Sequence, residues 1–173
     1  MLAWALRLYK AAPDREELRK DDIMIATIFH DVGRREAEIK HISHAEAGVP
    51  ITREYLQNAG YDAERIDYIC MLVGRHSDKY MMENENVDRG LLLLMEADLL
   101  DDMGAQGIVM DCMITESRNP RARFTDCLDH MTRFTRRIQQ YNPMVTAEGR
   151  QMWEKKTKLV EAFIDDLNED LIL

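Results

Sequence analysis

Glycine, proline and cysteine are scarce in this chain of 173 residues, which contains eight, four and three of them. Glycine and proline interrupt regular backbone, so their scarcity, with plentiful Met, Leu, Glu, Arg and Ala, favours helices. The three cysteines, Cys70, Cys112 and Cys127, show no CxxC spacing. An odd and sparse set of this kind indicates reduced thiols in a cytoplasmic protein.

Long apolar runs are also missing. The longest, LLLLM at 91–95, is far shorter than a membrane span, and the start MLAWALRLYK is too short and too interrupted by Arg7 for a signal peptide. A net charge of −9 argues against binding to a nucleic acid duplex, which needs a basic face. It leaves room for a local basic pocket that holds a small phosphorylated substrate.

Apolar residues recur at helical spacing along the chain, and no alternating stretch predicts a strand. We therefore expect an all-α, single-domain bundle of about seven or eight helices over residues 1–173. Ser43-x-x-Glu46 predicts a capping box, Asp62 an N-cap, and Gly33 a left-handed helix end. The expected helices cover approximately 1–11, 14–32, 43–59, 62–76, 87–103, 105–116, 125–140 and 146–167.

Three histidines and one aspartate fall on apolar helix faces, where core residues are expected. A buried carboxylate without a partner costs several kcal/mol, so Asp98 needs a cation or hydrogen-bond donors. A divalent metal would satisfy His30, Asp31 and Asp98 together, because imidazole and carboxylate suit Mn, Fe, Ni, Zn or Mg. The four residues on apolar faces are His30, His44, His76 and Asp98.

Structural interpretations compete with a metal site. A single His on an apolar face is more often an ordinary core histidine, and Asp98 could pair with Arg7 or Arg34 instead of a metal. We expect His41 on the surface and assign His130 to structure. On periodicity alone, the metal and structural interpretations therefore both stay open.

Four segments together resemble one known family: ATIFHDVGR, HISHAEAG, VGRHSDK and LLLMEADLLDDMGAQG. Their order and intervals, from Ile23 to about Ile108, are similar to those of the HD-domain metal-dependent phosphohydrolases, in particular the small single-domain bacterial HD proteins. The later TAEGRQMWEKKTKLVEAFIDDL looks like the closing helix of the same subgroup. The resemblance implies that His30, Asp31 and Asp98 are metal ligands.

The resemblance also implies roles for four further residues. His44 and His76 match positions near the site that, in some members, bind a second metal or contact phosphate. Arg34 and Lys79 resemble phosphate-contacting positions. The family's first ligand, a His, would lie about one helical turn before Met1, which implies a truncated N-terminus. With one ligand fewer, we expect a weak or empty metal site and low phosphatase activity in the chain as given.

The function implied is metal-dependent hydrolysis of a phosphate ester, of a nucleotide or another small phosphorylated metabolite. Asp31, His44 and His76 would be the catalytic residues, in a cytoplasmic protein without a membrane or duplex partner, and a homo-oligomer is compatible with this. One alternative is a catalytically degraded HD-fold module that binds a nucleotide or a partner protein. Another is an acidic helical bundle in which His30, Asp31 and Asp98 are paired internally.

Overall fold

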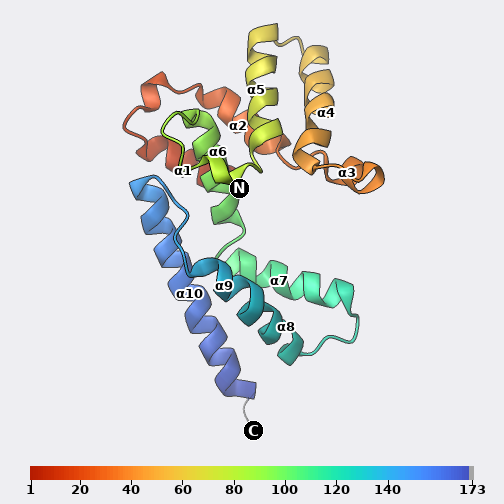
Figure 1. The fold of residues 1–173 in the computed structure, drawn as a ribbon, viewed down its shortest axis with the longest axis vertical. Helices are drawn as coiled ribbons and strands as arrows, with labels where there is room; N and C mark the ends of the chain where they lie inside the picture. Colours follow the sequence, from red (N-terminus) through yellow and green to blue (C-terminus); the bar gives the residue numbers. More distant parts are fainter. Residues whose placement is uncertain (172–173) are drawn as a thin grey trace. The chain divides into compact units, whose positions relative to one another are not determined.

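The structure, a computed structural model, describes residues 1–171, and every regular element in that range is helical (Figure 1). The predicted all-α class is therefore confirmed. The chain divides into two compact units, Met1–Asp98 and Leu99–Leu173. The description of residues 1–173 as one domain stays a prediction. No helix among the described residues combines the length and apolar character needed to cross a membrane.

The first unit contains all residues that the sequence singles out as site candidates. Helices α4 and α5 lie side by side, and α5 also packs against α2 (Figure 1). The LLLLM run lies in α6, and all five of its side chains are buried, as expected for a helix that is apolar on every face. The elements are α1 (Leu2–Ala11), η1 (Arg15–Glu17), α2 (Lys20–Phe29), α3 (Arg34–Lys40), α4 (His44–Asn58), α5 (Ala63–Arg75), η2 (Lys79–Met81) and α6 (Arg89–Asp101), whose last three residues belong to the second unit.

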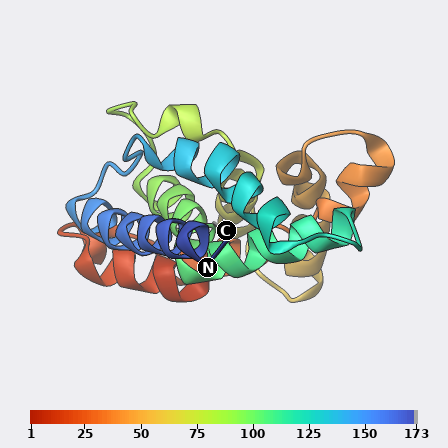
Figure 2. The ribbon, with the colours of Figure 1, turned by 90° about the horizontal axis from the view of Figure 1, so that it is seen from below.

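The second unit consists of α7 (Ala105–Arg118), α8 (Phe124–His130), the π-helical turn η3 (Met131–Thr135), α9 (Arg136–Gln139) and α10 (Ala147–Leu171). Figures 1 and 2 show the loop that joins α7 to α8. Asp111 of α7 accepts a hydrogen bond from Thr135 Oγ1 at 2.5 Å and lies 3.4 Å from Nε2 of His130. His130 and Thr135 are five residues apart, the spacing of a π-turn, so this turn directs both side chains to one carboxylate. The second unit also has a small buried core that consists of Ile108, Met131, Val160 and Ile164.

Two helix boundaries in the first unit differ clearly from the sequence-based predictions, and α3 was not predicted. The helix expected from residue 14 begins at Lys20, because Asp14 is engaged by Arg89 at 2.8 Å and the chain is extended at Leu18. The predicted left-handed end at Gly33 is wrong, since its φ is −83° and α2 already ends at Phe29. Glycine is needed there for close packing instead: a Cβ would lie 2.2 Å from the carbonyl oxygen of His44.

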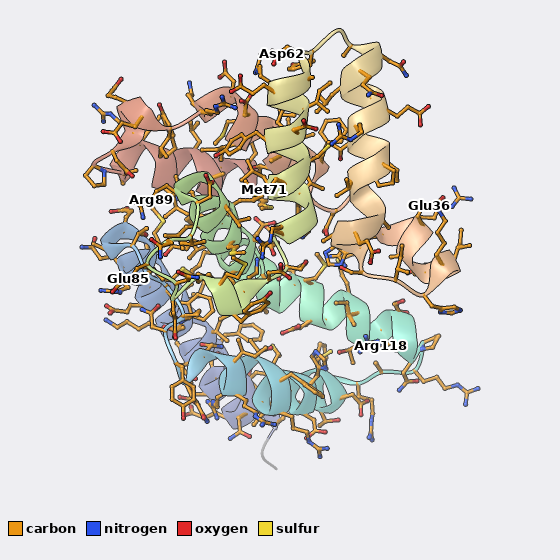
Figure 3. The ribbon with its side chains drawn as sticks, turned by 45° about the horizontal axis from the view of Figure 1, so that its top comes forward. Glu36, Asp62, Met71, Glu85, Arg89 and Arg118 are labelled. Atoms are coloured by element: carbon orange, nitrogen blue, oxygen red, sulfur yellow. The ribbon has the colours of Figure 1, made fainter. Side chains whose placement is uncertain are left out.

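Helix capping provides a test of the local structure. The side chain of Asp62, labelled at the start of α5 in Figure 3, accepts a hydrogen bond from the amide of Arg65 at 2.9 Å. The capping box predicted at Ser43 and Glu46 is not formed, because the Ser43 side chain makes no cap hydrogen bond.

We predict that Asp62→Ala lowers the free energy of unfolding by about 1 kcal/mol, because it removes a formed N-cap. Ser43→Ala is the matched control, and it should cost clearly less, since no cap bond is lost. Urea unfolding of both variants, followed by circular dichroism, measures the difference. An equal loss in the two variants would contradict this assignment of the caps.

Candidate metal centre

The structure brings His30, Asp31, His44, His76 and Asp98 together in the first unit. His30 is the C-cap of α2 and His76 the C-cap of α5, while His44 is the first residue of α4 and Asp98 lies in α6. α2 ends at Phe29, and His30, which precedes Asp31, still has helical backbone angles (φ −51°, ψ −38°). The ring of His30 and the carboxylate of Asp31 lie 3.3 Å apart.

The rings of His30 and His76 are held in the same way. Nδ1 of His30 lies 2.9 Å from the carbonyl oxygen of Thr27, and Nδ1 of His76 lies 2.7 Å from that of Val73. A carbonyl only accepts hydrogen bonds, so Nδ1 carries the proton and Nε2 of the neutral ring is an acceptor. Histidines that bind metals are typically held by a second-nitrogen bond of this kind.

Ring nitrogens of His30 and His44 lie close to two carboxylates. Nε2 of His30 lies 3.3 Å from Asp31 Oδ2 and 3.7 Å from Asp98 Oδ1. On the other side, Nε2 of His44 lies 3.3 Å from Asp31 Oδ1 and 3.1 Å from Nε2 of His76. Asp31 therefore directs Oδ2 toward His30 and Oδ1 toward His44.

The donor set fits a divalent metal ion. One ligand atom from each of Asp31, His44 and His76 lies within 4.8 Å of the other two, and Asp31 Oδ1 is buried and accepts no hydrogen bond. A buried polar atom without a partner is costly, and a shared cation would satisfy it. This group of three differs from the ligands that the family resemblance implies, which are His30, Asp31 and Asp98. The two groups share Asp31.

Internal cations also lie beside the carboxylates. The Arg34 guanidinium lies 2.6 Å from Asp31 Oδ2, and the ammonium of Lys79 lies 2.7 Å from Asp98 Oδ2. The cation next to Asp98 is thus neither Arg7 nor Arg34. Internal pairing thus accounts for Oδ2 of each carboxylate, while Nε2 of His30 faces Asp31 Oδ2 and Asp98 Oδ1.

The site environment shifts three pKa values downward. Burial lowers the pKa of His44, with the charge of Asp31 opposing, and burial lowers the pKa of His76, with the carbonyl of Val73 and the charge of Asp98 opposing. Burial alone would raise the pKa of Asp31, but the hydrogen bond from Arg34 and the nearby charges of basic groups outweigh it and hold that pKa below its usual range. Both imidazoles therefore stay in the neutral, metal-binding form to lower pH than an ordinary histidine.

These shifts predict a loss of stability in acid. A histidine whose pKa is depressed in the folded state takes up its proton first in the unfolded state, so stability falls as pH drops below about 6.5. The contribution of Asp31 is present above about pH 4 and is lost only as pH falls through its lower folded-state pKa. The window from pH 7.5 to 5.5 thus reports the histidines.

We predict that metal-free protein loses unfolding free energy between pH 7.5 and 5.5, and that His76→Asn loses less. Asparagine keeps a donor for the carbonyl of Val73 but cannot be protonated in this range. Urea unfolding at the two pH values measures the effect. His41→Asn, at an exposed position, is the control, and its loss of unfolding free energy between the two pH values should equal that of wild type. An unchanged pH dependence in His76→Asn would contradict the prediction.

Sequence reasoning missed Ser77. Its hydroxyl lies 3.3 Å from Nε2 of His44 and 3.2 Å from Nε2 of His76, so it contacts both rings. The sequence hinted at Ser77 only through its position directly after His76. Helical periodicity does not predict the direction of a side chain that lies beyond the end of the helix. His41 is exposed as expected, and His130 lies outside the site, in the second unit.

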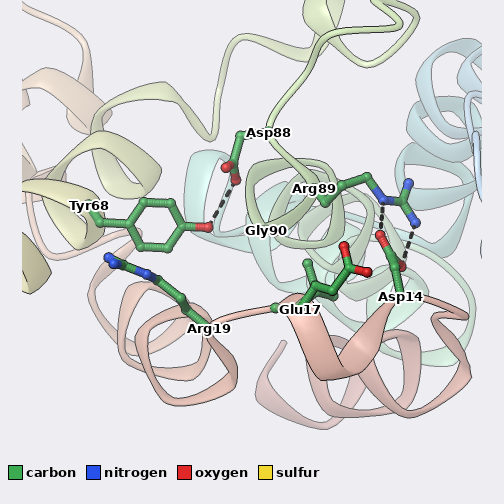
Figure 4. A pocket seen from close by; sticks show the side chains of 8 residues that line it. Asp14, Glu17, Arg19, Tyr68, Asp88, Arg89 and Gly90 are labelled. Atoms are coloured by element: carbon green, nitrogen blue, oxygen red, sulfur yellow. Dashed lines mark hydrogen bonds and ion pairs between the residues drawn. The ribbon is translucent and has the colours of Figure 1, made fainter.

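A separate pocket of about 280 Å³ lies in the same unit (Figure 4). Its polar groups bind one another: Arg89 donates to Asp14 at 2.8 Å, and the hydroxyl of Tyr68 donates to Asp88 at 3.0 Å (Figure 4). A Cβ on Gly90 would lie 2.4 Å from the Tyr68 hydroxyl. These groups are engaged in holding the fold, and the histidine and aspartate cluster remains the candidate site.

Comparison with solved structures agrees with the fold. An HD superfamily hydrolase from Bacillus thuringiensis shares the fold with a TM-score of 0.66 and 18% identity, over 98% of this chain and 83% of that one. A predicted HD superfamily hydrolase from an uncultured Thermotogales bacterium gives a TM-score of 0.63 and 18% identity, over 98% and 78%. Bacillus subtilis YpgQ in complex with ADP gives 0.55 and 16%, over 88% of each chain.

No curated protein matches the sequence. The family model of the HD domain matches residues 1–103, a range that includes the whole candidate metal centre and more than half of the chain. The predicted family is therefore confirmed: this chain belongs to the HD domain family.

Proposed function

We propose that this protein is a metal-dependent phosphohydrolase that acts on a small phosphorylated metabolite, with a nucleotide as the favoured substrate class. One observation carries the proposal: acceptor nitrogens of His30 and His76 and the carboxylates of Asp31 and Asp98 meet in one cluster. Membership of the HD domain family supports it. The ADP in the YpgQ structure supports the substrate class.

His30, Asp31 and Asp98 would hold one divalent ion, and Asp31, His44 and His76 would hold a second. A bound divalent ion polarises a phosphoryl oxygen and makes water a better nucleophile at neutral pH. The nature of the donors, imidazole and carboxylate, suits Mn, Fe, Ni, Zn or Mg.

The protein's own groups supply the rest of the chemistry. Asp31 orients the attacking water, and with only the first ion bound His44 or His76 exchanges a proton at Nε2, a role suited to a neutral imidazole. Arg34 lies at the edge of the site with a side chain that is 66% exposed. From there its guanidinium pairs with the substrate phosphate, for which it offers parallel donors.

The test uses the purified full chain in three steps. Metal content is measured directly, binding of Mn²⁺, Ni²⁺ and Mg²⁺ is titrated, and hydrolysis is followed with nucleoside diphosphates and triphosphates and with chromogenic phosphate mono- and diesters. The double variant His30→Ala/Asp31→Ala controls for contaminating phosphatase. Metal-dependent turnover that disappears in the double variant supports the proposal.

Two results would count against it. Metal or nucleotide binding without turnover of any ester would favour the alternative, a non-catalytic HD-fold module. Failure of the wild-type chain to bind Mn²⁺, Ni²⁺ or Mg²⁺ even weakly would remove the metal centre itself and leave an internally paired acidic bundle.

A further inference from the structure

The side chain of Lys79 contacts two candidate metal ligands, Asp98 and His76. Lys79 begins the short helix η2, and its side chain is only 28% exposed. Its ammonium donates to Asp98 Oδ2 at 2.7 Å, to the carbonyl oxygen of His76 at 2.8 Å and to that of Met95 at 3.3 Å. An ammonium has three protons, so these three acceptors engage all of them.

The contact with Asp98 gives its two oxygens different partners. Oδ2 accepts from Lys79, whereas Oδ1 lies 3.7 Å from Nε2 of His30. A carboxylate held at one oxygen by a charged hydrogen bond keeps its orientation. Lys79 therefore keeps Oδ1 of Asp98 directed toward the ring of His30.

The contact with His76 fixes a second candidate ligand. His76 is the C-cap of α5, and the last carbonyls of a helix have no partner within the helix. Lysine is a suitable donor to such carbonyls. By reaching from the carbonyl of His76 to Met95 and Asp98, Lys79 ties the end of α5 to α6.

The backbone beneath Lys79 is itself fixed. Its amide donates to the carbonyl oxygen of Ser77 at 2.9 Å, and the preceding Asp78 lies 3.3 Å from the guanidinium of Arg75 in α5. Because Lys79 lies on a short hydrogen-bonded turn, its side-chain contacts cost less conformational entropy than they would from an open loop.

We propose that Lys79 is a positioning residue for the metal ligands Asp98 and His76, and not a contact to the substrate phosphate. The inference rests on the proposed function, since it takes these two residues as ligands. Charge alone would act in the opposite direction, because a cation beside Asp98 repels a divalent ion. If Lys79 positions the ligands, its net effect must therefore be to raise the affinity for the metal.

Titration of Mn²⁺ into the metal-free full chain tests the proposal. Lys79→Met removes all three donors with little change in side-chain length, and Mn²⁺ affinity should fall about 10-fold or more, as when outer partners of metal ligands are lost. Lys20→Met, at the other end of α2 from His30, is the matched control and should bind Mn²⁺ as wild type. Unchanged affinity in Lys79→Met, or raised affinity, overturns the inference.

Lys79→Arg separates geometry from charge, and it covers the case in which Lys79→Met does not fold. Arginine keeps the charge, but its planar fork does not direct three protons to three surrounding acceptors. Mn²⁺ affinity should fall at least about threefold, and wild-type affinity would overturn the inference. Wild-type chain that binds no Mn²⁺ would instead remove the proposed function, so the two failures are distinguishable.

Kinetics give an independent measurement. At saturating Mn²⁺, a positioning role predicts that Lys79→Met lowers kcat about 10-fold or more while KM stays within about threefold. A phosphate contact made equally in the ground and transition states would raise KM with kcat nearly unchanged. The second pattern would also overturn the inference.

Discussion

Asp31→Asn should lower Mn²⁺ affinity by at least about 100-fold, the upper end of what loss of an outer partner costs, and reduce hydrolysis to background. Asp31 contacts both groups of candidate ligands, because its Oδ2 lies 3.3 Å from Nε2 of His30 and its Oδ1 lies 3.3 Å from Nε2 of His44. Asparagine has nearly the same shape but no negative charge, and one of its two groups is a donor. That donor would face either the Arg34 guanidinium or the ring of His44.

The fold should survive this substitution. The Asp31–Arg34 pair has side chains that are 31% and 66% exposed, and an exposed pair contributes about 0–1 kcal/mol. Asp67→Asn is the matched control, because it removes an exposed ion pair, 2.7 Å long, between Asp67 in α5 and Arg53 in α4. Calorimetric titration and circular dichroism of both variants separate loss of metal from loss of structure. Wild-type Mn²⁺ affinity in Asp31→Asn would mean that the carboxylate is not a ligand.

Gly33→Ala should lower the free energy of unfolding by about 3 kcal/mol or more, at or beyond the usual range for overpacking. An added Cβ would lie 2.2 Å from the carbonyl oxygen of His44 and 2.3 Å from the amide nitrogen of Gly48. Both neighbours are backbone atoms, so the turn before α3 and the start of α4 must move apart. Because His44 begins α4, the same movement should displace its ring from Asp31 and weaken metal binding.

Gly48→Ala is the control on the facing helix. Its Cβ would lie 3.3 Å from Val73 Cγ1, 3.5 Å from Val32 Cγ1 and 3.6 Å from the amide nitrogen of Gly33, with no backbone atom closer than an ordinary contact. Alanine favours a helix over glycine by about 1 kcal/mol. We expect a change within about 1 kcal/mol. Urea unfolding of the two variants, with Mn²⁺ titration of each, measures both effects. Similar stability of Gly33→Ala and wild type would show that the two segments can separate without cost.

Sequence reasoning placed helices best where apolar periodicity was uninterrupted and the ends were marked. The helix expected over about 62–76 is observed at Ala63–Arg75, with Asp62 as its cap. It failed at residues 14–19, whose charged side chains suit an exposed helix. There the carboxylate of Asp14 binds Arg89, 75 residues away, and a contact at that separation leaves no trace in local spacing.

The sequence by itself determined the helical class, the family and the residues to examine: His30, Asp31, His44, His76 and Asp98. The motif order, with residues on apolar helix faces, was sufficient for that. Only the tertiary structure decided how these residues meet, because the distances depend on how α2, α4, α5 and α6 pack, and packing sums many weak contacts between distant segments. It alone showed that Asp31 serves both halves of the cluster and that Lys79 binds Asp98. The contact of Lys79 with Asp98 could not be predicted, because Lys79 lies in a polar stretch without periodicity, where a short turn sets the direction of its side chain.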